Sequence, residues 1–288
     1  MFVKDNSLAS ARTYFQDRLA NKFTDSELKS MWKQMICKRF DWNASDFLLN
    51  QSCKLSESDL LFVRSFVKRL LNDEPFQYIL GETIFYDLKI NCDSRALIPR
   101  PETEELVDWI SELNVVNEII DVCSGSGCIA LAVKSVFKNA NVKGIDISPE
   151  AIELSTFNAS ENNLDVEFKL ADALNKNDLF WDSISELDVM VSNPPYITEN
   201  EKLEMSANVL NFEPHLALFV ENDSPIIFYK RIADLAIEKL KKNGFLFFEL
   251  NPIFAKEVFD YVGSIGFINI ELRKDLQGKE RMLKAQKV

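Results

Sequence analysis

The chain has 288 residues, 47% of them hydrophobic, and 45 acidic against 33 basic side chains give it a formal net charge of −12. This size and apolar content suffice for one large domain or two. The acidic balance argues against a general nucleic-acid-binding protein or a protein that binds anionic membranes, because both need a basic surface. Residues 1–75 carry 12 basic and 10 acidic side chains, so the excess acidity lies in the later part of the chain.

The five cysteines are odd in number and never spaced as Cys-x-x-Cys, which indicates neither a disulfide framework nor a structural zinc site. His215 is the only histidine, so a Ser-His-Asp triad or a histidine-based metal site would depend on it alone. Residues 1–10 contain no apolar signal core, and no stretch approaches the ~18 apolar residues of a membrane span. We expect a soluble cytoplasmic protein without a metal centre.

Apolar residues recur at helical spacing in three stretches of the first 75 residues, at 8–19, 28–36 and 60–70. The second stretch follows Thr24-x-x-Glu27, a capping-box pattern, and the third follows Ser56-x-x-Asp59. The pattern predicts a small helical bundle whose aromatic and Met side chains form its core.

The pattern changes between Glu74 and Asp93. Phe76, Tyr78 and Leu80 alternate, Gly81 follows, and two further apolar runs lie at 84–86 and 88–90. This alternation predicts short β segments around a turn, which we interpret as a β-hairpin linker.

A helix is then predicted from Pro101, because proline suits the first helical turn. Arg100 and Glu102 flank this start. Their charges can serve a binding site or simply the helix end, since acidic side chains favour a helix amino terminus.

The next segment has the pattern of a ligand-binding crossover. Residues 118–122 read as a strand, and Gly125 and Gly127 follow in a Gly-x-Gly-x-x-Ala arrangement that lets a ligand approach a helix amino terminus. A second strand at 142–147 ends in Asp146, 19 residues beyond Gly127, where a carboxylate can accept both hydroxyls of a ribose. Nicotinamide enzymes and S-adenosylmethionine enzymes both use this arrangement.

The remainder alternates strands and helices and closes with two strands, which predicts an α/β fold with a doubly wound sheet. Asp172 follows the third strand and is placed to hydrogen-bond an adenine amino group, although a turn residue is the simpler interpretation. The expected strands are 166–170, 188–191, 245–250, 267–272 and 281–287, and the expected helices are 224–240 and 254–262.

The strand 188–191, the fourth after residues 118–122, 142–147 and 166–170, is followed by Asn193-Pro-Pro-Tyr196. Two prolines cannot continue a ladder, so the strand must stop there. The Asn193 side-chain oxygen and the Pro194 carbonyl are two acceptors, and Tyr196 offers a flat aromatic face. Such a site suits a planar NH₂ group, although the same residues are also common in turns.

Several ordered motifs together resemble the class I S-adenosylmethionine-dependent methyltransferases, and within them the HemK/PrmC family of release factor glutamine methyltransferases. The resemblance covers nearly the whole chain and rests on residues 74–81, 97–104, 121–127, 146, 193–196, 212–214 and 273–281. The chain departs from the family at Cys123, where a glycine is frequent, and at Ala173, where some relatives place an aromatic side chain over the adenine.

The resemblance implies a Rossmann-like methyltransferase domain at 96–288, with an antiparallel terminal strand pair, a helical substrate-recognition domain at 1–75 and the hairpin linker at 76–95. The expected cofactor is S-adenosyl-L-methionine, with S-adenosyl-L-homocysteine as product. The expected substrate is the glutamine of the Gly-Gly-Gln motif of peptide chain release factors, which a monomer would methylate without binding nucleic acid or membrane.

The resemblance also implies roles for individual residues. Asn193, Pro194 and Tyr196 would form the catalytic site. The substrate would contact these three residues together with Pro195, Arg100, Glu102 and Glu213. The cofactor would contact Asp121, Cys123, Ser124, Gly125, Ser126, Gly127, Asp146, Ile147, Asp172, Ala173 and Asn193.

Four alternatives differ in their acceptor or their class. A ribosomal protein glutamine is a close alternative substrate, although residues 101–104 look more like the release-factor branch. Exocyclic amino groups of nucleic-acid bases are also planar NH₂ groups, but the net acidity favours a protein substrate. A nicotinamide-dependent oxidoreductase would leave residues 193–196 without a role, and a non-enzymatic binding module would leave the whole set of residues at the strand ends unexplained.

Overall fold

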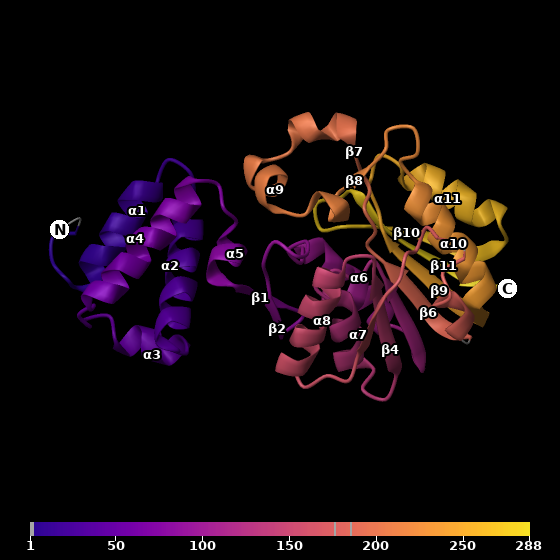
Figure 1. Ribbon diagram of the computed structural model, residues 1–288, viewed down its shortest axis with the longest axis horizontal. Coiled ribbons are helices and arrows are strands. Elements are labelled where there is room, and N and C mark those ends of the chain that lie inside the picture. Colours follow the sequence, from indigo (N-terminus) through magenta and orange to yellow (C-terminus); the bar gives the residue numbers. More distant parts are fainter. Residues whose placement is uncertain (1–2, 176, 185) are drawn as a thin grey trace. The chain divides into compact units, whose positions relative to one another are not determined.

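The computed structural model describes residues 3–175, 177–184 and 186–288 (Figure 1). The chain divides into two compact units, and each is described by itself. The first unit comprises Met1–Gly81 with Ala207–Phe212, and the second comprises Glu82–Ser206 with Glu213–Val288.

The first unit is helical, as predicted. Its helices are α1 (Leu8–Leu19), α2 (Asp25–Phe40), α3 (Ala44–Leu49), α4 (Glu57–Leu71), α5 (Phe76–Leu80) and α9 (Ala207–Phe212). One apolar face of each of the long helices α1, α2 and α4 fills a shared core, in which Phe15 packs against Trp32. The capping boxes at Thr24 and Ser56 both form, since each side chain accepts a backbone N–H while the third helical residue bonds back.

The β segment expected over residues 76–80 is wrong, because these residues form helix α5. Pro75 precedes the helix, and Gly81 ends it with φ 83° while its N–H donates to the Gln77 carbonyl. Phe76 and Ile79 lie one helical turn apart and both pack into the core of the first unit. This packing outweighs the alternating pattern on which the β prediction was based.

The second unit contains the remaining elements. Its helices are α6 (Pro101–Ser111), α7 (Cys128–Val136), α8 (Pro149–Glu161), α10 (Ile227–Lys239) and α11 (Ala255–Ser264). Its strands are β1 (Glu82–Phe85), β2 (Leu88–Asn91), β3 (Glu118–Val122), β4 (Asn141–Asp146), β5 (Glu167–Leu170), β6 (Leu187–Ser192), β7 (Ile197–Thr198), β8 (Phe219–Val220), β9 (Leu240–Glu249), β10 (Phe267–Lys274) and β11 (Glu280–Lys287).

Seven strands form one sheet in the order β10-β11-β9-β6-β3-β4-β5. The five strands from β9 to β5 are parallel, and β11 pairs antiparallel with both β9 and β10. The predicted α/β class with an antiparallel terminal strand pair is therefore confirmed. The hairpin β1-β2 is also present, as an antiparallel pair of its own.

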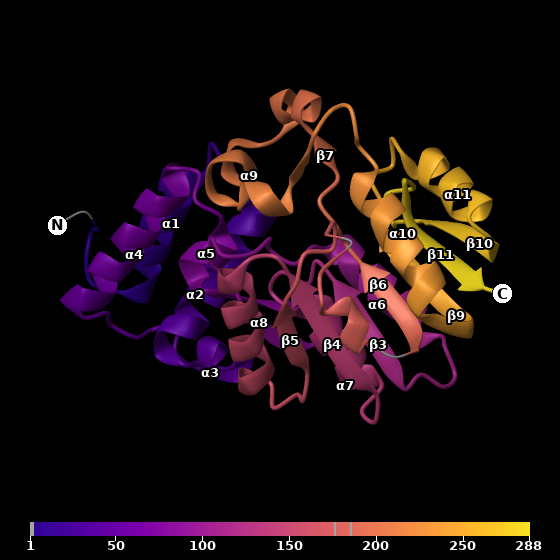
Figure 2. The ribbon, with the colours of Figure 1, turned by 45° about the vertical axis from the view of Figure 1, so that its right-hand side comes forward.

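Helices cover both faces of the seven-stranded sheet (Figures 1 and 2). Along β9, Phe248 packs edge-on against Tyr229 of α10, whereas the neighbouring Phe247 packs against Trp109 of α6. Successive side chains of a strand point to opposite faces, so α10 and α6 lie on opposite sides. The carboxyl ends of the parallel strands lie along one edge of the sheet. The strand order reverses between β3 and β6, and ligands bind at such a point in folds of this kind.

Candidate functional site

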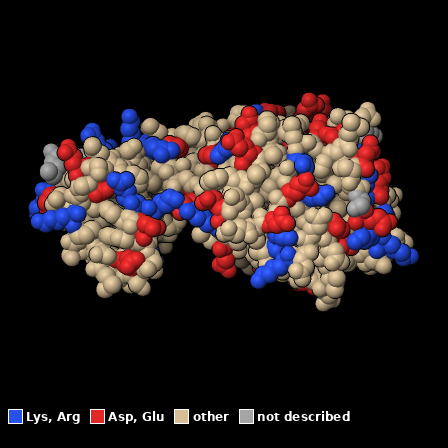
Figure 3. Space-filling model, turned by 60° about the horizontal axis from the view of Figure 1, so that its bottom comes forward, with Lys and Arg blue, Asp and Glu red and all other residues tan. Residues whose placement is uncertain are grey.

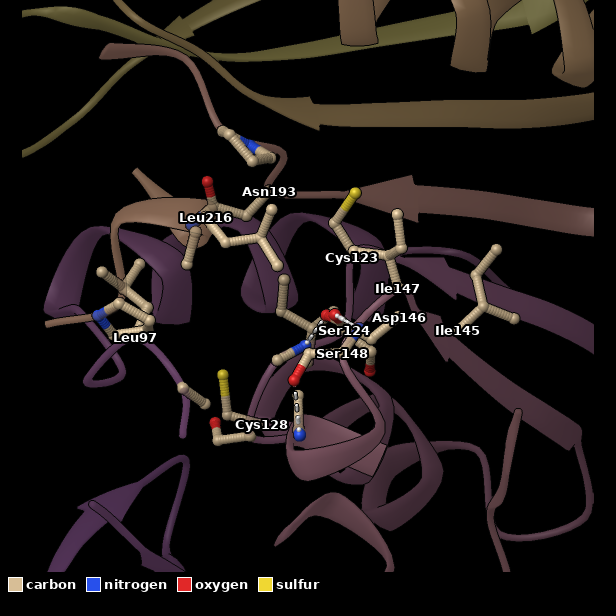
Figure 4. Close-up of a pocket in the computed structure, with 18 of the residues that line it drawn as sticks. Leu97, Cys123, Ser124, Cys128, Ile145, Asp146, Ile147, Ser148, Asn193 and Leu216 are labelled. Atoms are coloured by element: carbon tan, nitrogen blue, oxygen red, sulfur yellow. Dashed lines mark hydrogen bonds between the residues drawn. The ribbon is translucent and has the colours of Figure 1, made fainter. Parts of the chain in front are cut away.

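A cavity of about 250 Å³ lies at the carboxyl ends of β3, β4, β5 and β6 in the second unit (Figure 4). Figure 4 shows Ser124, Asp146 and Ser148 grouped together, with Asn193 across from them. Apolar side chains from loops and from helices α7 and α10 complete the wall, including Ile98, Ile129, Leu216 and Phe228. An apolar cavity with a few polar groups is typical of a small-molecule site.

The loop after β3 turns through left-handed backbone conformations. Gly125 and Gly127 have φ of 53° and 81°, and Cys123 has φ 62° although it carries a side chain. A Cβ atom at Gly127 would lie 2.7 Å from Cζ of Phe168 and 2.9 Å from Cβ of Ser155, so only glycine fits there. Cys123 and Gly125 line the cavity, whereas Gly127 does not and is the N-cap residue of α7.

Asp146 holds this loop from the end of β4. Its Oδ2 accepts the Gly125 N–H at 2.9 Å, and its Oδ1 accepts the Ser148 N–H at 2.9 Å. Burial raises the pKa of the Asp146 carboxyl, although these backbone hydrogen bonds oppose the rise. Each carboxylate oxygen can accept more than one hydrogen bond, so Asp146 retains capacity for the hydroxyls of a ribose.

Asp121 lies behind the loop rather than in the cavity. Its side chain is fully buried, and its Oδ2 accepts from the Ser124 hydroxyl at 2.6 Å and from the Ala130 N–H at 3.2 Å. Its Oδ1 has no hydrogen-bond partner. Burial raises the pKa of Asp121 to about 7. The contacts of Asp121 therefore shape the loop, and any effect on a ligand acts through Ser124.

The other expected cofactor residues lie around the same cavity. Ser124, Ser126, Ile147, Asp172 and Ala173 all line it. Asp172 accepts the Leu174 N–H through Oδ1 at 2.8 Å, an interaction typical of a turn residue that leaves its carboxylate beside the cavity. The residues present fit S-adenosylmethionine in donor and acceptor chemistry. The adjacent strands β4 and β5 each have one carboxylate at the carboxyl end, Asp146 and Asp172, and both lie beside an apolar wall.

The four residues after β6 do not all face the cavity. Asn193 and Pro195 line it, whereas Pro194 is buried outside its lining. Tyr196 lies away from the cavity, and its hydroxyl donates to Oε1 of Glu249 at 3.1 Å. Burial raises the pKa of the Tyr196 phenol. Asn193 donates from Nδ2 to the Thr103 hydroxyl in a long hydrogen bond of 3.4 Å.

Arg100 and Glu213 form an ion pair, with 2.6 Å between Nη2 and Oε1. The Glu213 side chain is 1% exposed, and its Oε2 also accepts the Ile98 N–H at 3.2 Å. Arg100 lines the cavity, but Glu213 and Glu102 do not. Glu102 instead accepts a hydrogen bond from Gln277 at 3.1 Å. Of the expected charged substrate residues, the structure therefore brings Arg100 and Glu213 together and leaves Glu102 apart.

Two residues of the site escaped the sequence analysis. Thr103 and Glu249 are each 2% exposed and hydrogen-bond each other beside Asn193. The sequence did indicate Glu249, because it is an acidic residue within the apolar run 245–250. Burying a carboxylate in such a strand is costly unless the carboxylate is hydrogen-bonded. Thr103 carried no signal of its own within the charged stretch around it.

Metal and membrane features are absent from the part of the chain that the structure describes. Residues 3–175, 177–184 and 186–288 include no group of three or more His, Cys, Asp and Glu side chains placed to bind a metal ion. None of the helices in these ranges has the length and apolar character required to span a bilayer.

Comparisons with known proteins agree with this geometry. A family model described as "Methyltransferase small domain" matches residues 101–212, and one described as "PrmC N-terminal domain" matches residues 10–81. A release factor glutamine methyltransferase of Flavobacterium psychrophilum is 39% identical over 95% of this chain and 96% of its own length. One of Bacteroides thetaiotaomicron is 35% identical over 95% of this chain and 98% of its own length.

Solved structures agree on the fold. A methyltransferase from Pyrococcus furiosus has a TM-score of 0.50 at 16% identity and covers 69% of this chain and 89% of its own. A human methyltransferase 10 domain containing protein has a TM-score of 0.50 at 16% identity and covers 70% and 90%. The identity and near-complete coverage of the sequence relatives show that the chain belongs to the release factor glutamine methyltransferase family.

Proposed function

We propose that this protein transfers the methyl group of S-adenosylmethionine to the side-chain amide nitrogen of the glutamine in the Gly-Gly-Gln motif of peptide chain release factors. The observation that carries the proposal is a single cavity with Asp146 on one side and Asn193 on the other, at the strand ends of a methyltransferase fold. Family membership supports the choice of release factor as substrate.

The cofactor, when bound, supplies an electrophilic sulfonium methyl. Asp146 would accept the ribose hydroxyls, because its carboxylate is already aimed by two backbone N–H groups. Asp172, Ile147 and Ala173 would surround the adenine, and the backbone of residues 123–126 would contact the rest of the molecule. Burial raises the pKa of the Cys123 thiol well above its usual range, so this residue would add no negative charge to the cavity that holds the cofactor.

The amide substrate needs alignment more than activation. An amide nitrogen is a poor nucleophile, because its lone pair is delocalised into the carbonyl. We propose that the Asn193 side-chain oxygen accepts one amide hydrogen and that the backbone carbonyl of Pro194, which lies between the two lining residues Asn193 and Pro195, accepts the other. This arrangement turns the nitrogen lone pair towards the methyl group. Pro195 would form the wall beside the planar amide. No strong base is required before transfer, since the nitrogen loses its proton readily once it carries the methyl group.

The test is methyl transfer to purified release factor by the wild type and by Asn193→Ala. We expect Asn193→Ala to abolish turnover while its affinity for S-adenosylhomocysteine, measured by calorimetry, stays within about threefold. Near-normal turnover in this variant would refute the role of Asn193. Binding of NAD in place of S-adenosylhomocysteine would favour the oxidoreductase alternative.

We also propose that the helical unit holds the folded release factor, because a short Gly-Gly-Gln segment offers little area for affinity. Residues 1–75 have a net charge of +2 from 12 basic and 10 acidic side chains, whereas the remaining residues have −14 from 21 and 35. Leu48 and Leu49 of α3 are 72% and 79% exposed, which is unusual for two adjacent large apolar residues and suits a protein contact.

Replacing both leucines with serine should raise the KM for whole release factor at least fivefold and leave the KM for a short Gly-Gly-Gln peptide unchanged. Leu179→Ser, at a residue that is 80% exposed in the second unit, is the matched control. Equal KM values for the double variant and the wild type would show that α3 does not contact release factor.

The distribution of surface charge bears on the alternative in which a nucleic-acid base is the methyl acceptor. On the face shown in Figure 3, basic and acidic side chains of the described residues are interspersed over both units. A groove for a nucleic-acid backbone needs a concentration of positive charge. Release factor and an adenine-containing oligonucleotide compared as acceptors in one assay would separate the two functions.

A further inference from the structure

The amide of Asn193 can be oriented in two ways, and only one of them suits the proposed reaction. With Oδ1 towards the substrate, the side chain accepts a hydrogen bond from an amide N–H; with Nδ2 towards it, two donors face each other. The side chains around Asn193 must therefore fix its orientation. Three of them, from separate segments of the second unit, make a connected hydrogen-bond chain.

The chain starts at Glu249, the last residue of β9. The register of the parallel strands pairs Ser192 with Phe248, so Asn193 and Glu249 leave neighbouring strands at the same level. The Glu249 carboxylate is 2% exposed and takes two hydroxyl donors, Thr103 on Oε2 at 2.6 Å and Tyr196 on Oε1 at 3.1 Å. Burial raises the pKa of the Glu249 carboxyl, and its hydrogen bonds from Thr103 and Tyr196 oppose the rise. In its ionised form the carboxylate can only accept, so both hydroxyls then donate to it.

The direction of the hydrogen bond from Thr103 to Glu249 fixes the direction of the next one, between Asn193 and Thr103. A threonine hydroxyl has a single proton, and Thr103 gives that proton to Glu249. Towards Asn193 it can therefore only accept, and the group that donates to it, 3.4 Å away, is Nδ2 of Asn193. The Asn193 Oδ1 then remains for the cavity, where Asn193 is part of the wall.

We infer that Glu249 and Thr103 are positioning residues that set the Asn193 amide with its oxygen towards the substrate NH₂ group, and that Tyr196 stabilises the same carboxylate from the other side. The inference rests on the proposed function, because it assigns an orientation that only an NH₂-bearing substrate requires. It also gives Tyr196 a role that does not depend on facing the cavity.

The decisive comparison is Thr103→Val with Thr103→Ser. Valine keeps the shape and the methyl group of the buried side chain and replaces the hydroxyl with a second methyl group, whereas serine keeps the hydroxyl and removes the methyl group. A positioning role predicts that the valine variant loses about 5- to 160-fold in kcat, the range for a buried group left without its hydrogen-bond partner, while the serine variant stays within about threefold of wild type. A packing role predicts the reverse order.

Further measurements separate orientation from general damage. We expect the dissociation constant for S-adenosylhomocysteine and the KM for release factor to change less than threefold in Thr103→Val. Glu249→Gln should lower kcat by at least tenfold, because a glutamine NH₂ can donate to Thr103 and release the hydroxyl to turn Asn193 around. Tyr196→Phe should lose less than Thr103→Val, and Tyr261→Phe, which removes a hydroxyl bonded to Asp234 elsewhere in this unit, should match the wild type.

An activity-independent readout keeps this inference distinct from the proposed function. In ¹⁵N-labelled protein, the two Asn193 side-chain amide protons should differ in their hydrogen-exchange rates, and Thr103→Val should accelerate the slower one at least tenfold. A wild type that transfers no methyl to release factor would refute the proposed function while this exchange test still decides the orientation. Equal kcat values and equal hydrogen-exchange rates in Thr103→Val and the wild type would refute the inference.

Discussion

The ion pair between Arg100 and Glu213 should stabilise the wall of the cavity, and its loss should be measurable as a loss of folding stability. Glu213 is almost completely buried, and its second oxygen holds the Ile98 N–H. Removal of the Arg100 guanidinium would leave a buried carboxylate without its cation. Residues 95–100 line the cavity, so their displacement should also reduce ligand affinity.

The expected magnitude follows from the exposure of the two partners. Breaking a fully buried pair costs about 3–5 kcal/mol, and an exposed pair contributes about 1 kcal/mol or less. Arg100 is 33% exposed on its side chain, so we expect Arg100→Met to lower the free energy of unfolding by about 2–3 kcal/mol. For a unit of roughly 200 residues this corresponds to a fall in Tm of about 4–12 °C.

A double-mutant cycle with Glu213→Gln tests the reasoning. The second substitution removes the buried charge, so the double variant should be more stable than the sum of the single losses predicts, by about 1–2 kcal/mol. Differential scanning calorimetry with and without S-adenosylhomocysteine identifies the relevant transition, because ligand binding raises the Tm of the unit that holds the cavity. Additive losses, or an Arg100→Met variant as stable as the wild type, would refute the pairing.

Three further predictions concern the loop around the cavity. Asp146→Asn should weaken S-adenosylhomocysteine binding at least tenfold in calorimetry, because an amide cannot accept both the Gly125 and Ser148 N–H groups; unchanged affinity would contradict this. Cys123→Gly should bind within about threefold of wild type, whereas Cys123→Val should be less stable by about 1–2 kcal/mol in urea unfolding, because a β-branched residue is strained at φ 62°. Asp121 has a folded-state pKa of about 7, above its unfolded value, so its contribution to stability is present at low pH and is lost as pH rises through 7. Asp121→Asn should flatten the fall in stability between about pH 4 and pH 7, where the unfolded chain is ionised at this residue and the folded one is not, and an unchanged pH profile would show that Asp121 is ionised throughout.

The sequence predicted the elements whose signals are local. The capping boxes at Thr24 and Ser56 and the apolar runs of β3, β6 and β9 identified helices and strands that the structure contains. Helix α5 was missed, because five residues are too few to distinguish helical from alternating spacing and tertiary packing decides between them. Helix α3 was missed as well, although Asn43 and Asp46 form a capping box.

The residues of the site also divide into those that local sequence signals predict and those that only the tertiary structure reveals. Residues at the ends of consecutive parallel strands could be brought together from sequence, because a parallel sheet places those ends along one edge. The contacts of Tyr196 and Glu213 could not, since Glu249 and Arg100 approach them from distant parts of the chain. Sequence alone therefore indicated which residues gather at the cavity, while the structure was needed to show which side chains face it.

Mass spectrometry of release factor after incubation with this protein and S-adenosylmethionine shows directly whether the Gly-Gly-Gln glutamine is the methyl acceptor. We expect one added methyl group, located by fragmentation on the glutamine of the Gly-Gly-Gln motif and absent after incubation with Asn193→Ala. A release factor without a methyl group at that glutamine, together with methylation of a ribosomal protein or a nucleic-acid base by the same protein, would contradict it.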